Sequence, residues 1–165
     1  MPSKIATKSV RYRLGLALIA CAALASAPAS ADPTEEGDPL TSQLDPDFAA
    51  GKAAIEAKEW KAAIARLSSA ALRDTRNADI QNYLGYAHRQ LGEMDAAFRH
   101  YERSLKLDPR HRGAHEYVGE AWLKVGNLQK AEEHLAALRK ICLIPCEETD
   151  DLQQAITRYR LAKKQ

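Results

Sequence analysis

The sequence lacks the short motifs that mark the common classes of enzyme. Its 165 residues contain no glycine-rich phosphate-binding loop, no nucleophile elbow and no zinc-protease helix signature. Adjacent carboxylates such as Glu132 and Glu133 would point apart on a helix, which does not suit shared acid–base chemistry. The sequence therefore predicts a protein without catalytic activity and without a cofactor.

Long apolar runs are also missing. The apolar run at residues 14–24 falls short of the roughly 20 residues that a membrane-spanning helix needs. Four basic residues precede the run and a small-residue site, Ala29-Ser30-Ala31, follows it. This arrangement is typical of a secretory signal peptide, so residues 1–31 are predicted to direct export, and the mature protein is expected in the bacterial periplasm without a membrane span.

Cys21 leaves an alternative to cleavage after Ala31. Residues 18–21 read Leu-Ile-Ala-Cys, which resembles the cleavage box of bacterial lipoproteins. Cys21 would then become a lipidated N-terminus that anchors the protein. Cleavage after Ala31 is favoured because the apolar run continues past Cys21 toward the better small-residue site.

Excess charge of one sign is absent from the predicted mature chain. Residues 1–31 hold four of the 24 Lys and Arg and none of the 22 Asp and Glu, which leaves 20 positive and 22 negative side chains and a net charge of −2. So small a charge gives no electrostatic footprint for nucleic acid or for an anionic membrane. Residues 32–44 are acidic and poor in large apolar groups, and are expected to form a disordered linker.

Small residues recur in the rest of the chain at a fixed step of 34 residues. The step separates three glycines and three alanines: Gly51, Gly85 and Gly119, and Ala63, Ala97 and Ala131. Within each copy, apolar residues fall at three- and four-residue steps in two runs separated by a short break. Each copy is therefore expected to form two amphipathic helices joined by a turn, and copies that cannot bury their apolar faces alone must stack.

The middle copy, ADIQNYLGYAHRQLGEMDAAFRHYERSLKLDP, resembles the tetratricopeptide repeat along its whole length. The signature residues of that family are matched in three copies by Gly51, Ala63, Gly85, Ala97, Tyr101, Pro109, Gly119, Trp122 and Ala131. The first copy departs from the pattern, with Lys58 where glycine is usual. The resemblance implies an all-α, right-handed superhelical stack of three helix-turn-helix repeats in a small exported bacterial protein.

The predicted organisation follows from these boundaries. Residues 45–145 hold the three repeats, at about 44–77, 78–111 and 112–145. Asp45 and Pro46 suit the start of the first helix, as an N-cap and a first-turn proline. Residues 146–165 are expected to form a capping helix, at 147–163, and a basic tail, because a repeat stack needs a terminal helix with one polar face.

The resemblance also places a binding surface. In tetratricopeptide stacks the first helix of each pair lines the concave face. Its inward positions correspond here to Phe48, Lys52, Ile55, Asn82, Tyr86, Arg89, Glu116, Glu120 and Leu123. The charge is expected to change sign along this groove, from Lys52 and Arg89 to Glu116 and Glu120.

The implied function is that of a non-catalytic adaptor or scaffold that binds a protein or peptide of the cell envelope in this groove. Family members that grip the C-terminal carboxylate of heat-shock chaperones use a clamp of basic and asparagine residues, which this groove does not reproduce. A carboxylate-tail ligand is therefore disfavoured. Self-association into a homo-oligomer through the ends of the stack is compatible with this function.

Only two cysteines, Cys142 and Cys146, remain after the predicted signal peptide. In an oxidising compartment, such a pair predicts a local disulfide, with Pro145 breaking the helix between the two side chains. The alternative is a metal- or redox-handling factor, because two close thiolates suit Cu(I). The disulfide is favoured, since the sequence fixes no third ligand.

Histidine gives no clear metal site. His111 and His115 would share one helix face if the helix began before His111. No carboxylate or thiol is placed beside them by spacing alone, and His88, His100 and His134 are dispersed. The sequence therefore predicts no histidine-based metal site.

Overall fold

The structure is a computed structural model that describes residues 45–164. The predicted signal peptide at 1–31, with Cys21, and the predicted linker at 32–44 lie outside these residues. The described part contains helices and no strands: α2 (Pro46–Glu56), α3 (Trp60–Arg73), α4 (Ala78–Gln90), α5 (Met94–Leu107), α6 (Arg112–Lys124), α7 (Leu128–Ile141) and α8 (Glu147–Ala162). None of these helices is long and apolar enough to cross a bilayer.

Local sequence sets where several of the helices begin. The Asp45 carboxylate accepts hydrogen bonds from the backbone N–H groups of Asp47 and Phe48, and Pro46 opens α2. The Asn77 side chain accepts from the N–H of Ile80 at the start of α4. Asn127 caps α7 in the same way. These side chains pair backbone donors that an isolated helix leaves unpaired.

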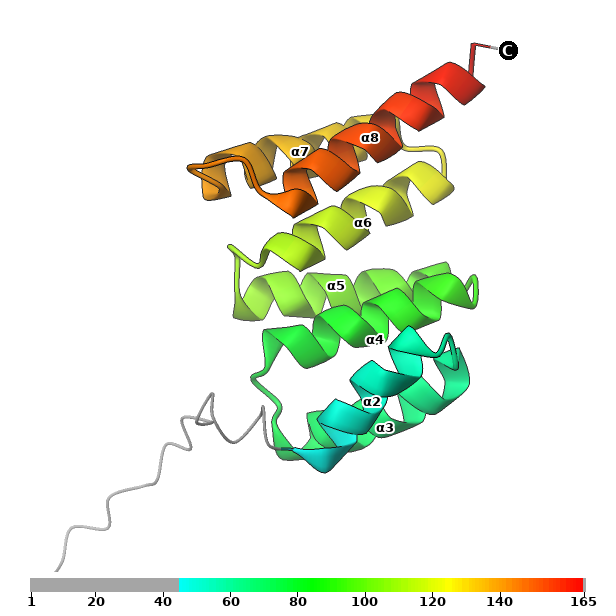
Figure 1. Ribbon diagram of the computed structural model, residues 1–165, viewed down its shortest axis with the longest axis vertical. Coiled ribbons are helices and arrows are strands. Elements are labelled where there is room, and N and C mark those ends of the chain that lie inside the picture. Colours follow the sequence, from blue (N-terminus) through cyan, green and yellow to red (C-terminus); the bar gives the residue numbers. More distant parts are fainter. Residues whose placement is uncertain (1–44, 165) are drawn as a thin grey trace, which may run out of the picture. The chain divides into compact units, whose positions relative to one another are not determined.

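The helices form pairs that stack on one another. In Figure 1, α2, α4, α6 and α8 lie on the near face and α3, α5 and α7 lie behind them. α2 packs on α3, α4 on α5, and α6 on α7, and each pair also contacts the next one. This arrangement confirms the predicted all-α stack of three helix pairs followed by a capping helix.

Glycine allows close approach within the pairs. A Cβ on Gly51 would lie 2.6 Å from Cγ of Leu67, and a Cβ on Gly85 would lie 2.6 Å from Cε1 of Tyr101. Both partners belong to the second helix of the same pair and are fully buried. The small residue therefore lets a large side chain from the second helix pack against the first helix.

In the third pair, the large side chain that packs against the glycine of the first helix comes from the capping helix α8. The atoms nearest to a Cβ on Gly119 belong to Leu152 of α8, at 2.7 Å. Leu152 and Ile156 are fully buried in a cluster with Ala131, Leu135 and Leu138 of α7. One face of α8 thus covers the apolar surface that the last pair would otherwise expose.

Candidate functional site

Two hollows lie on the surface formed by α2, α4, α6 and the start of α8. The first, of about 520 Å³, is lined by Phe48, Lys52 and Tyr83 among others. The second, of about 490 Å³, is lined by Asn82, Glu116, Tyr117 and residues of α8. Asp79 and Tyr83 belong to both hollows. The two hollows are therefore adjacent on this surface, and together we call them the groove.

Aromatic rings form the start of the groove. The ring centroids of Phe48 and Tyr83 lie 6.0 Å apart, so α2 and α4 are joined by an aromatic contact. The ammonium group of Lys52 lies 5.7 Å from the Phe48 ring and 5.9 Å from the Tyr83 ring. Lys52 is exposed, whereas Phe48 is buried. This end of the groove thus combines an apolar wall with an accessible positive charge.

A second aromatic cluster joins α4 to α6 and α3. Tyr86 lies 4.8 Å from Tyr117 and 5.9 Å from Trp60, measured between ring centroids. The guanidinium of Arg89 lies 5.1 Å from the Tyr86 ring and 5.6 Å from the Tyr117 ring. The first helices α4 and α6 are therefore held together by tilted aromatic rings and the guanidinium of Arg89.

Arg89 is committed to a contact inside the protein. Its side chain is buried, with only 4 % of the residue exposed, and donates a hydrogen bond to Oε2 of Glu120 at 2.6 Å. A buried arginine paired in this way is held in place and is not available to a ligand. The predicted alternation of charge along the groove is therefore incomplete, because Lys52 is exposed and Arg89 is neutralised by Glu120.

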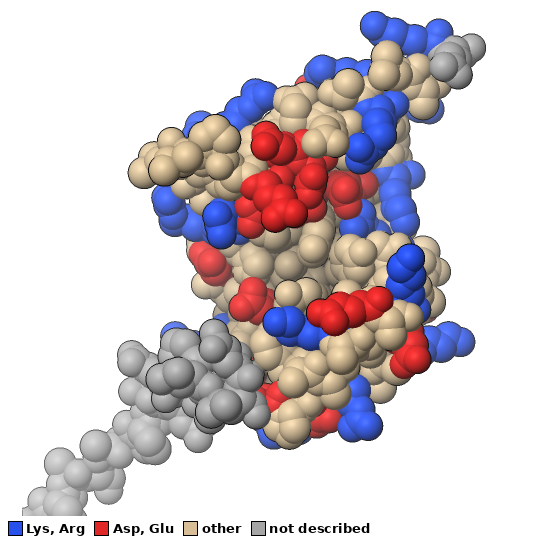
Figure 2. All heavy atoms as spheres, viewed as in Figure 1, with Lys and Arg blue, Asp and Glu red and all other residues tan. Residues whose placement is uncertain are grey.

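The far end of the groove is acidic. Figure 2 shows acidic side chains gathered over the N-terminal part of α8. Burial raises the pKa of Glu116, the nearby carboxylates of Glu120, Asp151 and Glu148 act in the same direction, and together these effects hold it at about 8. Burial also raises the pKa of Tyr117. Negative charge is thus crowded where α6 meets the capping helix.

The nine predicted groove residues do not all lie in the hollows. Phe48, Lys52, Asn82 and Glu116 line them. Tyr86, Arg89 and Glu120 form the contacts between α4 and α6 described above. The last two, Ile55 and Leu123, pack against core clusters. That the groove binds a partner stays a prediction for all nine.

The sequence-based selection missed Asp79, Tyr83 and Tyr117, and it also missed the α8 residues. Tyr83 and Tyr117 are 34 residues apart and hold the same position in their repeats, as does Ala49. That shared position was a usable signal. No repeat pattern pointed to Glu148 and Asp151, because they belong to the capping helix.

Histidine side chains take part in contacts within the stack. In each of the three repeats, one polar pair 19 residues apart joins the first helix to the second. These pairs are Asp47 with Arg66, Gln81 with His100, and His115 with His134. His111 precedes α6 as its N-cap, and its Nε2 lies 3.0 Å from Asp79. His111 and His115 therefore face different partners and do not converge on one site.

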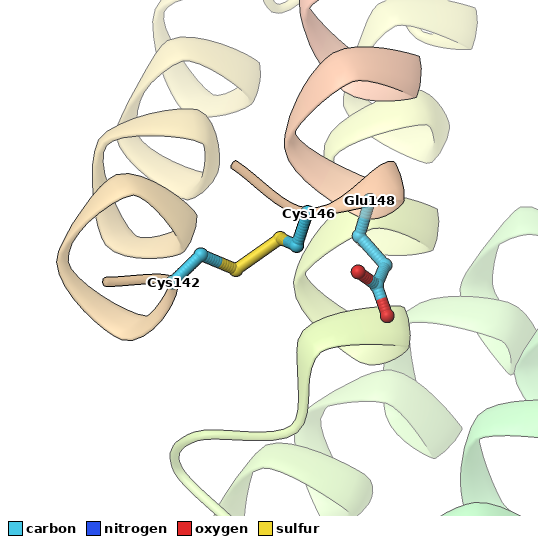
Figure 3. Close-up of side chains that lie close together, drawn as sticks. All are labelled: Cys142, Cys146 and Glu148. Atoms are coloured by element: carbon cyan, nitrogen blue, oxygen red, sulfur yellow. A yellow bond between two sulfur atoms is a disulfide. The ribbon is translucent and has the colours of Figure 1, made fainter. Parts of the chain in front are cut away.

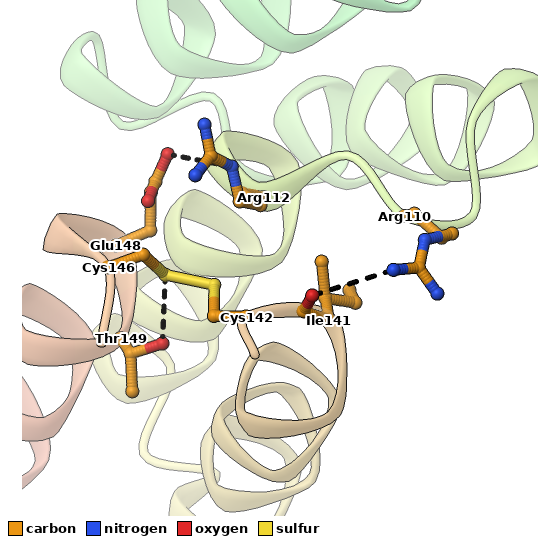
Figure 4. Close-up of a disulfide and its surroundings, with 7 residues drawn as sticks. All are labelled: Arg110, Arg112, Ile141, Cys142, Cys146, Glu148 and Thr149. Carbon is orange, nitrogen blue, oxygen red and sulfur yellow. Dashed lines mark hydrogen bonds and ion pairs between the residues drawn. A yellow bond between two sulfur atoms is a disulfide. The ribbon is translucent and has the colours of Figure 1, made fainter. Parts of the chain in front are cut away.

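Cys142 and Cys146 are joined by a disulfide, with their Cα atoms 6.1 Å apart. Together with Glu148 they form the one group of three His, Cys, Asp or Glu side chains in residues 45–164 whose ligand atoms lie within 4.8 Å of one another (Figure 3). The oxidised pair offers no thiolate, and Glu148 contacts Arg112 at 3.5 Å (Figure 4). In this form the cysteines connect α7 to α8 and do not suit a soft metal ion.

Comparison with known families and structures places the fold. Residues 78–111 and 95–142 match the tetratricopeptide repeat family. No curated protein sequence matches the chain.

Among similar solved structures is the TPR2B domain of yeast Sti1 in complex with pHsp70, with TM-score 0.66 and 16 % identity, covering 74 % of this chain and 98 % of that one. A second is the Yersinia enterocolitica type III secretion chaperone SycD with a peptide of the translocator YopD, with TM-score 0.63 and 16 % identity, covering 73 % and 95 %. The Arabidopsis OM64 TPR domain has TM-score 0.64 and 17 % identity, covering 74 % and 97 %. Residues 78–142 thus match the tetratricopeptide repeat family, and residues 45–164 have the all-α fold of a tetratricopeptide stack.

Proposed function

We propose that the protein is a non-catalytic adaptor or scaffold that binds a segment of another protein in the groove. The observation that carries the proposal is the pair of adjacent hollows formed by α2, α4, α6 and α8, which are lined by aromatic, cationic and acidic groups. Pockets for side chains arranged along a groove are the usual basis for recognising an extended or helical peptide. Two of the similar structures, those of Sti1 and SycD, are complexes with a protein or peptide, which supports the same function here.

We place this activity in the bacterial periplasm or envelope, with an envelope protein as partner. The support is the sequence of residues 1–31, which resembles a signal peptide, and the Cys142–Cys146 disulfide, a bond typical of oxidising compartments. Anchoring through a lipidated Cys21 is the alternative. Mass spectrometry of the mature N-terminus separates the two, because a chain that starts at Asp32 excludes lipidation at Cys21.

Site-specific crosslinking in an envelope fraction tests the groove. A photoreactive amino acid at position 52, in the groove, is expected to capture a defined protein. The same group at position 61, on the exposed surface of α3, is the matched control and is expected not to capture it. Recovery of the same proteins from both positions would contradict binding in the groove.

A pair of variants gives an independent test. Lys52→Glu with Tyr83→Ala changes one charge and removes one large side chain in the groove. Lys61→Glu with Leu72→Ala makes comparable changes on α3, where Leu72 is 83 % exposed. Only the first pair is expected to lose the captured protein, and the melting temperature of each variant shows whether it is folded.

A metal- or redox-handling factor is the second candidate, and the cluster of Cys142, Cys146 and Glu148 is the observation in its favour. The variant Cys142→Ser with Cys146→Ser separates the two functions. Partner capture is expected to survive in this variant, since neither cysteine lines the groove. By the loop-entropy account, loss of so short a disulfide ring costs about 2 kcal/mol at most. Loss of capture in a folded variant would favour the second candidate.

A further inference from the structure

The hollow between α4, α6 and α8 has a composition that points to one kind of ligand. Its lining contains six carboxylates, from Asp79, Asp108, Glu116, Glu147, Glu148 and Asp151. Two arginines, Arg110 and Arg112, also line it, so the net charge of the lining is −3 near neutral pH, with Glu116 protonated because its pKa is about 8 and with His111 counted as neutral. Such a concentration of one sign favours a cationic ligand.

Nearby cationic side chains pair with only some of the carboxylates in this hollow. Arg112 lies 3.5 Å from Glu148, and His111 lies 3.0 Å from Asp79. Arg110 is directed to the backbone carbonyl of Ile141 at 3.5 Å. Among the residues that the structure describes, no cationic group lies within 4.0 Å of Glu116 or Asp151. Burial and the neighbouring carboxylates hold the pKa of Glu116 at about 8, because they outweigh the opposing effect of Arg89.

Asn82 gives a second and independent indication. The residue lines the same hollow and is only 4 % exposed, yet its Oδ1 has no hydrogen-bond partner in the described part of the chain. A buried acceptor without a partner is costly, and a ligand that donates hydrogen bonds relieves that cost.

The distances between the carboxylates indicate how large a cation the hollow can bind. No three carboxylates of this hollow bring their ligand atoms within 4.8 Å of one another in residues 45–164, so they do not surround a single metal ion. A guanidinium is larger, planar, and carries five donors that reach separate acceptors. Tyr83 and Tyr117 also line the hollow, and aromatic faces favour a guanidinium.

We propose that this hollow receives an arginine side chain of the partner segment, with Glu116, Asp151 and Asn82 accepting its hydrogen bonds. The inference rests on the proposed function and names the chemistry that the groove selects. The exposed Lys52 lies at the other end of the groove. The two ends therefore differ in charge, and the partner segment would bind in one direction, with its arginine at the α8 end.

Short peptides of defined composition test the proposal. N-acetyl-Ala-Arg-Ala-amide is titrated into the purified protein, and binding is followed through the side-chain amide signal of Asn82 in NMR spectra. The lysine peptide is expected to bind several-fold more weakly, because an ammonium lacks the planar fork of donors. The peptide with citrulline, which is neutral and similar in shape, is expected to bind at least tenfold more weakly.

A matched pair of variants shows where the arginine binds. Glu116→Gln with Asp151→Asn removes two carboxylates from the hollow and is expected to weaken binding of the arginine peptide at least tenfold. Because the variant relieves crowded negative charge, it is expected to fold at least as well as the wild type. Glu102→Gln with Glu133→Gln removes two exposed carboxylates from α5 and α7 and is expected to leave binding unchanged.

Three outcomes would overturn the inference. They are equal binding of the arginine and citrulline peptides, unchanged binding by Glu116→Gln with Asp151→Asn, and tighter uptake of Ca²⁺ than of the arginine peptide, which would identify a site for a free cation. Crosslinking from position 52 distinguishes these results from failure of the proposed function. A protein still captured there means that the groove binds a partner without using arginine in this hollow.

Discussion

Lys58 occupies the turn position that glycine holds in the other two helix pairs. Its φ is +59°, and the corresponding values for Gly92 and Gly126 are +80° and +83°. The left-handed conformation costs an ordinary L-residue about 1–2 kcal/mol, whereas glycine adopts it freely. The repeat geometry thus requires this conformation in all three turns, and the first pair accepts the cost.

Lys58→Gly is therefore expected to stabilise the protein by about 0.5–1 kcal/mol, since relief of strain exceeds the added freedom of glycine in the unfolded chain. Gly92→Ala is expected to destabilise it by about 1 kcal/mol. A Cβ at Gly92 would meet no atom within 4 Å, so the loss reflects backbone conformation alone. Urea unfolding measures both changes, and a lower midpoint for Lys58→Gly would contradict the explanation.

At the scale of the element, α8 is both a cap and a wall of the groove. Its buried face, with Leu152 and Ile156, covers the last helix pair. Its first turns bring Glu148 and Asp151 to the second hollow. The disulfide between Cys142 and Cys146 spans the corner between α7 and α8. The helix that closes the core therefore also supplies part of the acidic end of the groove.

Leu152→Ala is expected to destabilise the protein by about 2–5 kcal/mol, the usual cost of emptying a fully buried leucine site. Gly119→Ala is expected to destabilise it as well, because the new Cβ would lie 2.7 Å from Leu152 Cδ2. In the Leu152→Ala background, the second substitution should cost less, since the crowded atoms are gone. Strictly additive free energies of unfolding in this double-mutant cycle would show that Gly119 and Leu152 do not contact each other.

At the scale of the whole molecule, buried titratable groups set a pH range for stability. Burial, together with the neighbouring His88 and His115, lowers the pKa values of His100 and His134 to about 4. The contribution of these histidines to the free energy of unfolding is fully present above about pH 6.5 and is lost as the pH falls through about 4. Glu116 acts in the opposite sense, because its pKa is raised from 4.5 to about 8. Its contribution is present below about pH 4.5 and is lost as the pH rises through about 8.

The free energy of unfolding is therefore expected to be greatest near pH 6.5. Below this pH the unfolded chain takes up protons at His100, His134 and His115, whose pKa values burial lowers, and this outweighs the single opposing carboxylate. Above this pH the opposing effect of Glu116 remains. Urea midpoints measured from pH 4 to pH 9 test the prediction. Glu116→Gln should flatten the decline above pH 6.5, whereas Glu102→Gln should not. An equal decline in the two variants would contradict the role of Glu116.

Much of the fold could be predicted from the sequence, because its determinants are local. The 34-residue step of Gly51, Gly85 and Gly119 reports the size of one helix pair, and Asp45 with Pro46 reports a helix start. The groove was predicted less completely. Tyr83 and Tyr117 repeat with the same period, but periodicity alone does not tell which face of a helix a hollow occupies.

The sequence by itself determined the repeat, its helices and the existence of a capping helix, since spacing, caps and turn residues act within a few positions of one another. Only the tertiary structure decided which charges remain available. Arg89 is neutralised by Glu120, 31 residues away, and His115 is paired with His134, 19 residues away. Glu116 meets the carboxylates of α8 only after the cap has docked. The free energy of a charged group depends on burial and on its neighbours in space, which no local pattern of residues specifies.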